Sequence, residues 1–97
     1  MSLPIGSQKR TTDGAIGVSG KKIRVYGFLV TADASGAVVA VYDGTDTNGV
    51  LMDSLVGAAS VVTRISYPGG LIFSSGCYLD IDSHTTSVVA IYEQENS

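Results

Sequence analysis

Apolar and polar residues alternate with a period of two along most of the chain, a pattern that is typical of β-strands. No stretch repeats its apolar residues at helical spacing over more than about two turns. Clusters of Gly, Ser, Asp and Pro separate the alternating runs, as expected of tight turns. The pattern predicts an all-β fold, an antiparallel β-sandwich that is jelly-roll-like, with seven to eight short strands. The expected strands span residues 21–31, 37–42, 50–56, 61–67, 71–73, 77–82 and 87–92.

The first of these strands, 21–31, has apolar residues on both of its faces. Strict alternation places Leu29 with Ile23 and Val25 on one face, and Phe28 with Tyr26 on the other. A strand in a two-layer sandwich needs only one apolar face, because the other faces water. The second apolar face therefore predicts contact with another molecule or with another copy of the chain.

The chain of 97 residues is long enough for one domain with one core. Residues 1–13 show no periodicity and are expected to form an extended N-terminal arm, followed by a single β-sandwich domain at 14–97. No apolar run approaches the roughly 20 residues of a membrane-spanning helix, and the first residues do not resemble a signal peptide. We therefore expect a soluble protein made in the cytoplasm, with no membrane partner.

Charge is distributed unevenly around a formal net charge of −3. Up to Arg24 the chain carries five basic residues and one acidic residue, whereas one basic residue and eight acidic residues follow. Such asymmetry suits head-to-tail contact between subunits or docking of the basic end on an acidic partner. Solvated charges that keep a small protein soluble explain it equally well. The acidic body disfavours nucleic acid as a partner.

Residues that support catalysis are scarce. The chain has one cysteine, Cys77, on the apolar face of an expected strand, and one histidine, His84, in a polar loop. Catalysis by a nucleophile needs a base and an orienting group beside it, and no motif supplies them. We expect no enzymatic activity, no catalytic residue and no cofactor.

Two groups of side chains offer oxygen ligands for a cation. They are Asp43, Asp46 and Asn48 in one loop, and Asp80 and Asp82 two residues apart. The loop lacks the ligand spacing and the closing Glu of a helix-loop-helix calcium site. Turn formation and solubility explain these residues better, so no metal site is predicted, although the sequence leaves cation binding open.

The five tyrosines all fall in or at the end of expected strands. Tyrosines can cap a core with their hydroxyl groups in water, or they can contribute rigid aromatic area to an interface. Both interpretations stay open. Combined with the basic N-terminal region, the second one predicts an interface formed by Lys9, Arg10, Arg24, Tyr26, Phe28 and Tyr78.

Three segments carry a resemblance to known proteins: KIRVYG at 22–27, VYDGT at 41–45 and PGGLIFSSG at 68–76. They resemble small β-rich virion proteins of tailed bacteriophages, a group that includes head decoration or cement proteins. The resemblance implies a non-enzymatic viral structural protein in the virion, made in the host cytoplasm. It also implies a jelly-roll-like homotrimer that clamps neighbouring subunits of the major capsid protein, or another virion protein, without a cofactor. The alternative is a carbohydrate- or receptor-binding β-sandwich module of a phage tail or head fibre.

Overall fold

Eight β-strands and no helix make up the part of the chain that the computed structural model describes, residues 6–94. The expectation of an all-β antiparallel sandwich is confirmed. The strands are β1 (Gly6–Arg10), β2 (Gly14–Ile16), β3 (Ile23–Ala32), β4 (Ala37–Asp43), β5 (Val50–Gly57), β6 (Val62–Phe73), β7 (Cys77–Ile81) and β8 (Thr85–Glu93).

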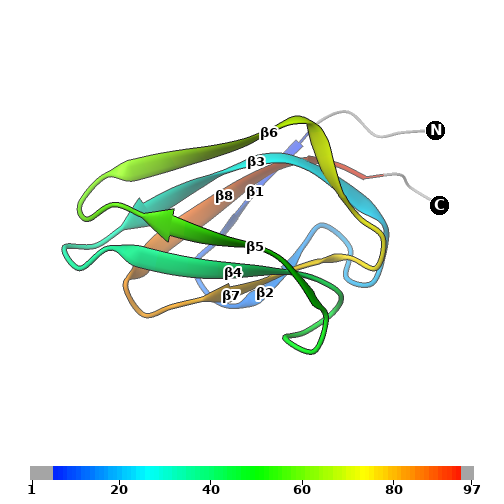
Figure 1. Ribbon diagram of the computed structural model, residues 1–97, viewed down its shortest axis with the longest axis horizontal. Helices are drawn as coiled ribbons and strands as arrows, with labels where there is room; N and C mark the ends of the chain where they lie inside the picture. The colour runs from blue at the N-terminus through cyan, green and yellow to red at the C-terminus, as the bar shows by residue number, and fades with distance from the viewer. Residues whose placement is uncertain (1–5, 95–97) are drawn as a thin grey trace.

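The strands form two four-stranded sheets that pack face to face (Figure 1). One has the order β1-β8-β3-β6 and is called the β3 sheet below; the other has the order β2-β7-β4-β5 and is called the β4 sheet. All neighbouring strands are antiparallel. The first strand pairs with the last, the second with the seventh, the third with the sixth and the fourth with the fifth.

Alternating residues of both sheets meet in one hydrophobic core. Phe28 and Phe73 are the largest side chains in it, from the β3 sheet, and Val39 and Leu79 face them from the β4 sheet. Tyr67 packs against this core with its ring perpendicular to that of Phe28, the ring centroids lying 6.0 Å apart. Burial of these apolar side chains is the main source of stability, because the chain has no disulfide.

A β-bulge in β3 changes which side chains enter the core. The pairing of β3 with both β6 and β8 shifts between Val25 and Gly27, so that Tyr26 is an extra residue in the ladder. Beyond the bulge the alternation is displaced by one residue: Phe28 points inward and is 1% exposed, and Leu29 points outward. The prediction that Phe28 contributes to an interface is therefore wrong, and Leu29 takes the outward position.

The pattern predicted that a strand ends at residues 68–70, and this prediction is wrong. The expected strands 61–67 and 71–73 form one strand, β6, whose two halves both pair with β3. Gly69 and Gly70 have φ angles of 79° and 87°, which let the backbone loop outward and return to the ladder. Arg24 fixes this excursion by donating a 2.6 Å hydrogen bond from Nη1 to the carbonyl oxygen of Gly69.

The N-terminal region also differs from the expected arm. Gly6–Arg10 forms β1, an edge strand of the β3 sheet, while residues 1–5 lie outside the described part of the chain. Side chains connect β1 to the edge of the other sheet. Gln8 Oε1 accepts a hydrogen bond of 2.8 Å from the Gly17 backbone, and the Arg10 guanidinium donates to the carbonyl oxygens of Asp13 and Ala15. The polar composition of 1–13 hid this strand, because its side chains bond across an edge instead of entering the core.

Candidate interaction surfaces

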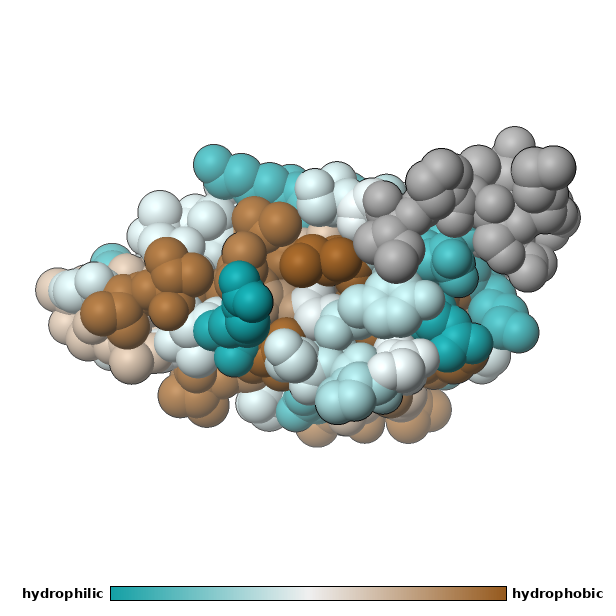
Figure 2. Space-filling model, turned by 90° about the horizontal axis from the view of Figure 1, so that it is seen from above, coloured by the Kyte–Doolittle hydropathy of each residue, from teal (hydrophilic) through white to brown (hydrophobic). Residues whose placement is uncertain are grey.

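Four apolar side chains lie together on the outer face of the β3 sheet, where no other layer covers them. Leu29 is directly opposite Val89. Ile91 and Val62 lie in the next outward-facing rows, opposite Gly27 and Thr31. We call these four residues the outer strip. Val62 and Ile91 are 58% and 37% exposed. Figure 2 views this face from above and shows hydrophobic residues gathered along it.

Basic side chains flank the outer strip on both sides. Lys9 on β1 pairs with Val89, and Arg64 on β6 pairs with Leu29, so one row across the sheet reads Lys9, Val89, Leu29, Arg64. Both basic residues are exposed. An apolar centre with charged residues at its edge is the general arrangement of a protein–protein interface.

The outer face of the β4 sheet differs in chemistry. Tyr78 and Tyr42 are cross-strand neighbours on it, and the adjacent row places Asp80 beside Ala40. The next row along carries Val38 and Val56, which are paired with each other and are 48% and 67% exposed. This face is therefore acidic and aromatic, with exposed apolar residues at its margin.

The structure divides the predicted interface residues among different places. Lys9, Arg24 and Tyr26 lie on the outer face of the β3 sheet, whereas Tyr78 lies on the opposite face of the molecule. Arg10 is turned toward the β1–β2 connection, where its guanidinium bonds to backbone carbonyls. Only three of the six residues thus share a surface.

Sequence analysis missed the outer strip and Arg64. The alternation in 87–92 already places Val89 and Ile91 on one side of a strand, which was the available signal. Leu29 was assigned to the opposite face from Tyr26, because a bulge has no simple signature in the sequence.

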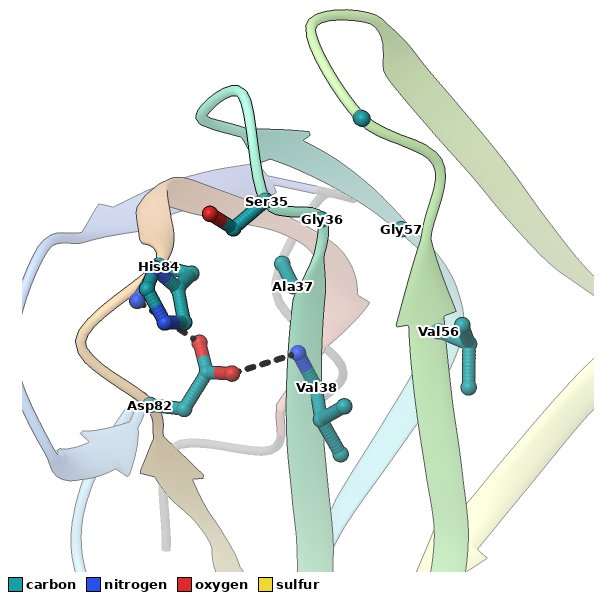
Figure 3. Close-up of a pocket in the computed structure, with 9 residues that line it drawn as sticks. Ser35, Gly36, Ala37, Val38, Val56, Gly57, Asp82 and His84 are labelled. Carbon is teal, nitrogen blue, oxygen red and sulfur yellow. Dashed lines mark hydrogen bonds between the residues drawn. The ribbon is translucent and has the colours of Figure 1, made fainter.

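A shallow pocket of about 380 Å³ lies at one end of the sandwich (Figure 3). It opens between the turn that precedes β4 and the end of β5, and it is lined by Ser35, Gly36, Ala37, Val38, Val56, Gly57, Ala59, Asp82 and His84. Its polar side chains come from the turn before β4, which supplies Ser35, and from the turn between β7 and β8, which supplies Asp82 and His84. The rest of the lining is aliphatic or glycine.

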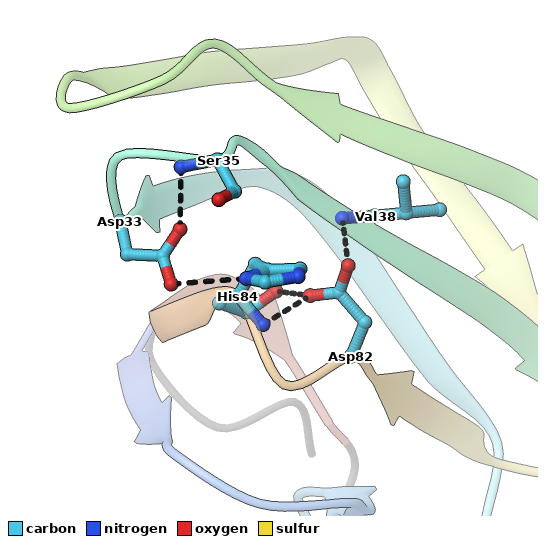
Figure 4. Close-up of polar contacts among 6 residues, drawn as sticks. Asp33, Ser35, Val38, Asp82 and His84 are labelled. Carbon is cyan, nitrogen blue, oxygen red and sulfur yellow. Dashed lines mark hydrogen bonds and ion pairs between the residues drawn. The ribbon is translucent and has the colours of Figure 1, made fainter.

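Hydrogen bonds around His84 hold the turns beside this pocket (Figure 4). His84 Nδ1 lies 3.1 Å from Asp33 Oδ2, and Asp33 Oδ1 accepts a bond of 2.8 Å from the Ser35 backbone. Asp82 Oδ2 accepts from the Val38 backbone at 3.0 Å, and its Oδ1 accepts from the Thr85 hydroxyl at 2.7 Å. The carboxylates thus bond to backbone and side-chain groups of the turns, which is a structural arrangement.

These hydrogen bonds favour the charged carboxylates. The bond from the Ser35 backbone, followed by the contact with His84, lowers the pKa of Asp33 from its ordinary value. Desolvation raises the pKa of Asp82, but the bonds from Thr85, Val38 and His84 outweigh it and the net shift is downward. Both groups therefore support the turns above the ordinary Asp pKa and lose this contribution as the pH falls below it.

Cys77 and His84 do not come together. Cys77 begins β7 and is fully buried, whereas His84 follows the other end of the same strand, so β7 alone separates them by roughly 13 Å. Burial, followed by the charge of Asp43, raises the pKa of the Cys77 thiol to about 12. At neutral pH the thiol is protonated and inaccessible, which makes it unsuited to act as a nucleophile.

The carboxylates considered as cation ligands accept hydrogen bonds from the protein. Asp43 accepts from the backbones of Ser74 and Ser75, and Asp46 Oδ1 accepts from the Asn48 backbone. Within residues 6–94, no three His, Cys, Asp or Glu side chains are grouped so that they could hold a metal ion.

No protein family, curated protein or solved structure matches the chain. Across the described residues there is also no helix long and apolar enough to cross a membrane.

Proposed function

We propose that the chain is a non-enzymatic structural protein of a virion, of the capsid decoration or cement type. In this role it self-associates, as a trimer, and clamps neighbouring capsid subunits. The observation that carries the proposal is the outer strip: four apolar side chains on a sheet face that residues 6–94 leave uncovered. Exposed apolar patches bordered by polar residues mark interaction sites on soluble proteins.

The position of the outer strip supports assembly better than scattered exposed residues would. Single exposed valines are common on protein surfaces and need no explanation. Here Leu29 and Val89 are direct neighbours in the centre of four strands, with Lys9 and Arg64 at the two ends of their row. This centre-and-rim pattern spans the width of a sheet, which favours docking of another protein surface over a small ligand.

The viral part of the proposal is supported by the resemblance and by the order of the strands. Two of the resembling segments, 22–27 and 68–76, form the region around the bulges of β3 and β6. Pairing of the first strand with the last, and so on inward to the fourth with the fifth, supports a jelly roll, an architecture common in viral capsid domains.

The self-association of the proposal is tested by sedimentation velocity of the wild type and of Val89→Lys. We expect the wild type to sediment as an oligomer and the variant as a monomer, because a lysine in the outer strip puts an uncompensated charge into the contact. Val18→Lys is the matched control, since Val18 is 59% exposed in a turn away from both sheet faces. A wild type that is monomeric at all concentrations, or an oligomer unaffected by Val89→Lys, contradicts the proposal.

The virion assignment has its own test, which is independent of assembly. Capsid or portal genes next to the coding sequence support it, and a position within a metabolic operon contradicts it. Detection of the chain by mass spectrometry in purified virions is the direct measurement.

A carbohydrate-binding module is the second candidate, favoured by the Tyr42–Tyr78 pair on the outer face of the β4 sheet. Adjacent half-buried tyrosines can form a flat platform on which a sugar ring stacks. A glycan array with the wild type and Tyr78→Ala decides it: binding that is lost in the variant supports this candidate, and no binding by the wild type removes it.

A further inference from the structure

The strands of the two sheets carry opposite charge. The outer face of the β3 sheet carries three basic residues and one acidic residue in its strands: Lys9, Arg24, Arg64 and Glu93. The outer face of the β4 sheet carries Asp80 in its strands, with Asp82 bonded to the Val38 backbone at its margin, and no basic residue. Asp43 and Asp53 lie off this face, because they accept hydrogen bonds from the Ser74 and Ser75 backbones and from the Tyr67 hydroxyl. The asymmetry seen along the sequence therefore becomes, after folding, a difference between two opposite faces of the molecule.

We infer that the outer face of the β3 sheet of one copy docks on the outer face of the β4 sheet of a second copy. This inference rests on the proposed self-association and specifies its geometry. Contact between unlike faces brings Lys9 and Arg64 toward the acidic face that carries Asp80. Complementary charges steer association and select the partner surface.

Contact between two like faces is disfavoured by the same charges. A two-fold arrangement of two β3 sheets would bring the basic residues that flank one outer strip close to those of the other copy. Among the described residues, neither Lys9 nor Arg64 has an ion-pair partner that would neutralise it, since the one ion pair joins His84 and Asp33. Like charges at an interface oppose binding.

Apolar surface is available on both faces, so the contact does not depend on charge alone. The β4 sheet exposes Val38, Leu51 and Val56 to 48%, 56% and 67%, around the row in which Ala40 and Ser54 present only small side chains. Burial of these residues against the outer strip would supply the hydrophobic part of the contact.

The two faces lie on opposite sides of the sandwich (Figure 1), so each copy that uses one face leaves the other available. Such head-to-tail contacts close into a ring or extend into a filament.

Charge reversal on each face, separately and together, tests the inference. The variants are Arg64→Glu, Asp80→Lys and the double variant that carries both changes. Each single variant should weaken self-association roughly tenfold or more, because an attractive charge pair becomes repulsive. The double variant should recover most of the wild-type affinity, since opposite charges again face each other. Lys21→Glu and Asp46→Lys make equal changes in connections outside the strands of both faces and should leave the affinity unchanged.

Sedimentation equilibrium on all five variants and the wild type separates the outcomes. Unchanged or stronger association in Arg64→Glu or in Asp80→Lys shows that these two charges do not face each other and overturns the inference, while the proposed self-association stands. A double variant that does not regain the wild-type affinity also overturns the inference and leaves the proposed self-association standing. A monomeric wild type overturns the self-association itself, and with it the inference.

Discussion

The inner and outer faces of the β3 sheet present similar chemistry to very different surroundings. Phe28 and Leu29 are consecutive residues of β3, and both are large and apolar. Phe28 meets the β4 sheet and is 1% exposed, whereas Leu29 lies beside Val89 of its own sheet and no second layer of residues 6–94 covers it. Apolar residues of one strand therefore differ in what they contact: those facing inward are buried in the core, and those facing outward are left partly exposed by the described part of the chain.

Replacing Phe28 and Leu29 with alanine, one at a time, tests whether the inner and outer faces differ in their contribution to stability. We expect Phe28→Ala to reduce the free energy of unfolding by about 3–5 kcal/mol, because it leaves a cavity in the core. Leu29→Ala should cost less than about 1 kcal/mol in the monomer, since its side chain is only partly buried. Urea denaturation at a protein concentration below that of assembly measures both values. Equal losses would show that the outer face is as important for folding as the inner one.

The exclusion of water from the core around Cys77 can be tested through the pH dependence of the free energy of unfolding. The thiol of Cys77 has its pKa raised from 9.0 to about 12, so the folded state retains a proton that the unfolded state releases above pH 9. The folded state therefore becomes less stable as the pH rises, by about 1.4 kcal/mol per pH unit between these two values. Comparison of urea unfolding at pH 9 and pH 11 measures the effect.

Cys77→Ala supplies the control for this pH dependence. The variant is less stable at neutral pH because of the smaller side chain, but it has no thiol to ionise. Tyr67, whose pKa is also raised by burial and by its bond to Asp53, still contributes to the alkaline loss in both proteins. If the free energy of unfolding of Cys77→Ala falls with pH as steeply as that of the wild type, the thiol does not contribute to the slope. That result would mean that water reaches Cys77 in the folded wild type.

Gly27→Ala tests whether the bulge in β3 places Leu29 on the outer face. A Cβ atom at position 27 would lie 2.5 Å from the carbonyl oxygen of Ile65, so the backbone of β3 or β6 must move. We expect a loss of about 1–3 kcal/mol in the free energy of unfolding. Gly6→Ala is the matched control, because a Cβ atom there meets no atom of residues 6–94 within 4 Å and should change little. A stable Gly27→Ala variant with unchanged assembly would show that the bulge does not set the position of Leu29.

The sequence was sufficient to predict the strands and the two-layer arrangement, because both depend on the period of the apolar residues. It was insufficient at the irregular places. The bulge at Tyr26 and the excursion at Pro68–Gly70 depend on how two strands match in register, which a pattern within one strand does not contain. β1 was missed for a related reason: its polar side chains bond to β2 and leave no apolar period to detect.

The six residues predicted to form one interface are not all on one surface, for the same physical reason. Lys9, Arg24 and Tyr26 do share a surface, as the combination of basic and aromatic residues indicated. Tyr78 is on the far side of the molecule, and Phe28 is in the core. A one-residue shift in a strand exchanges its two faces, so face assignments fail wherever an unseen bulge occurs.

Pairing between β1 and β8 has a consequence for how the chain can be rearranged. Gly6 lies opposite Tyr92, and the pairing continues to Arg10 opposite Val88, so the two ends of the described chain run side by side. A short linker can therefore bridge them, and new ends can be opened in the exposed turn at residues 58–61. Such a circular permutant keeps every strand pairing and both outer faces, which would make the molecule a scaffold for displaying a fused peptide at either rim.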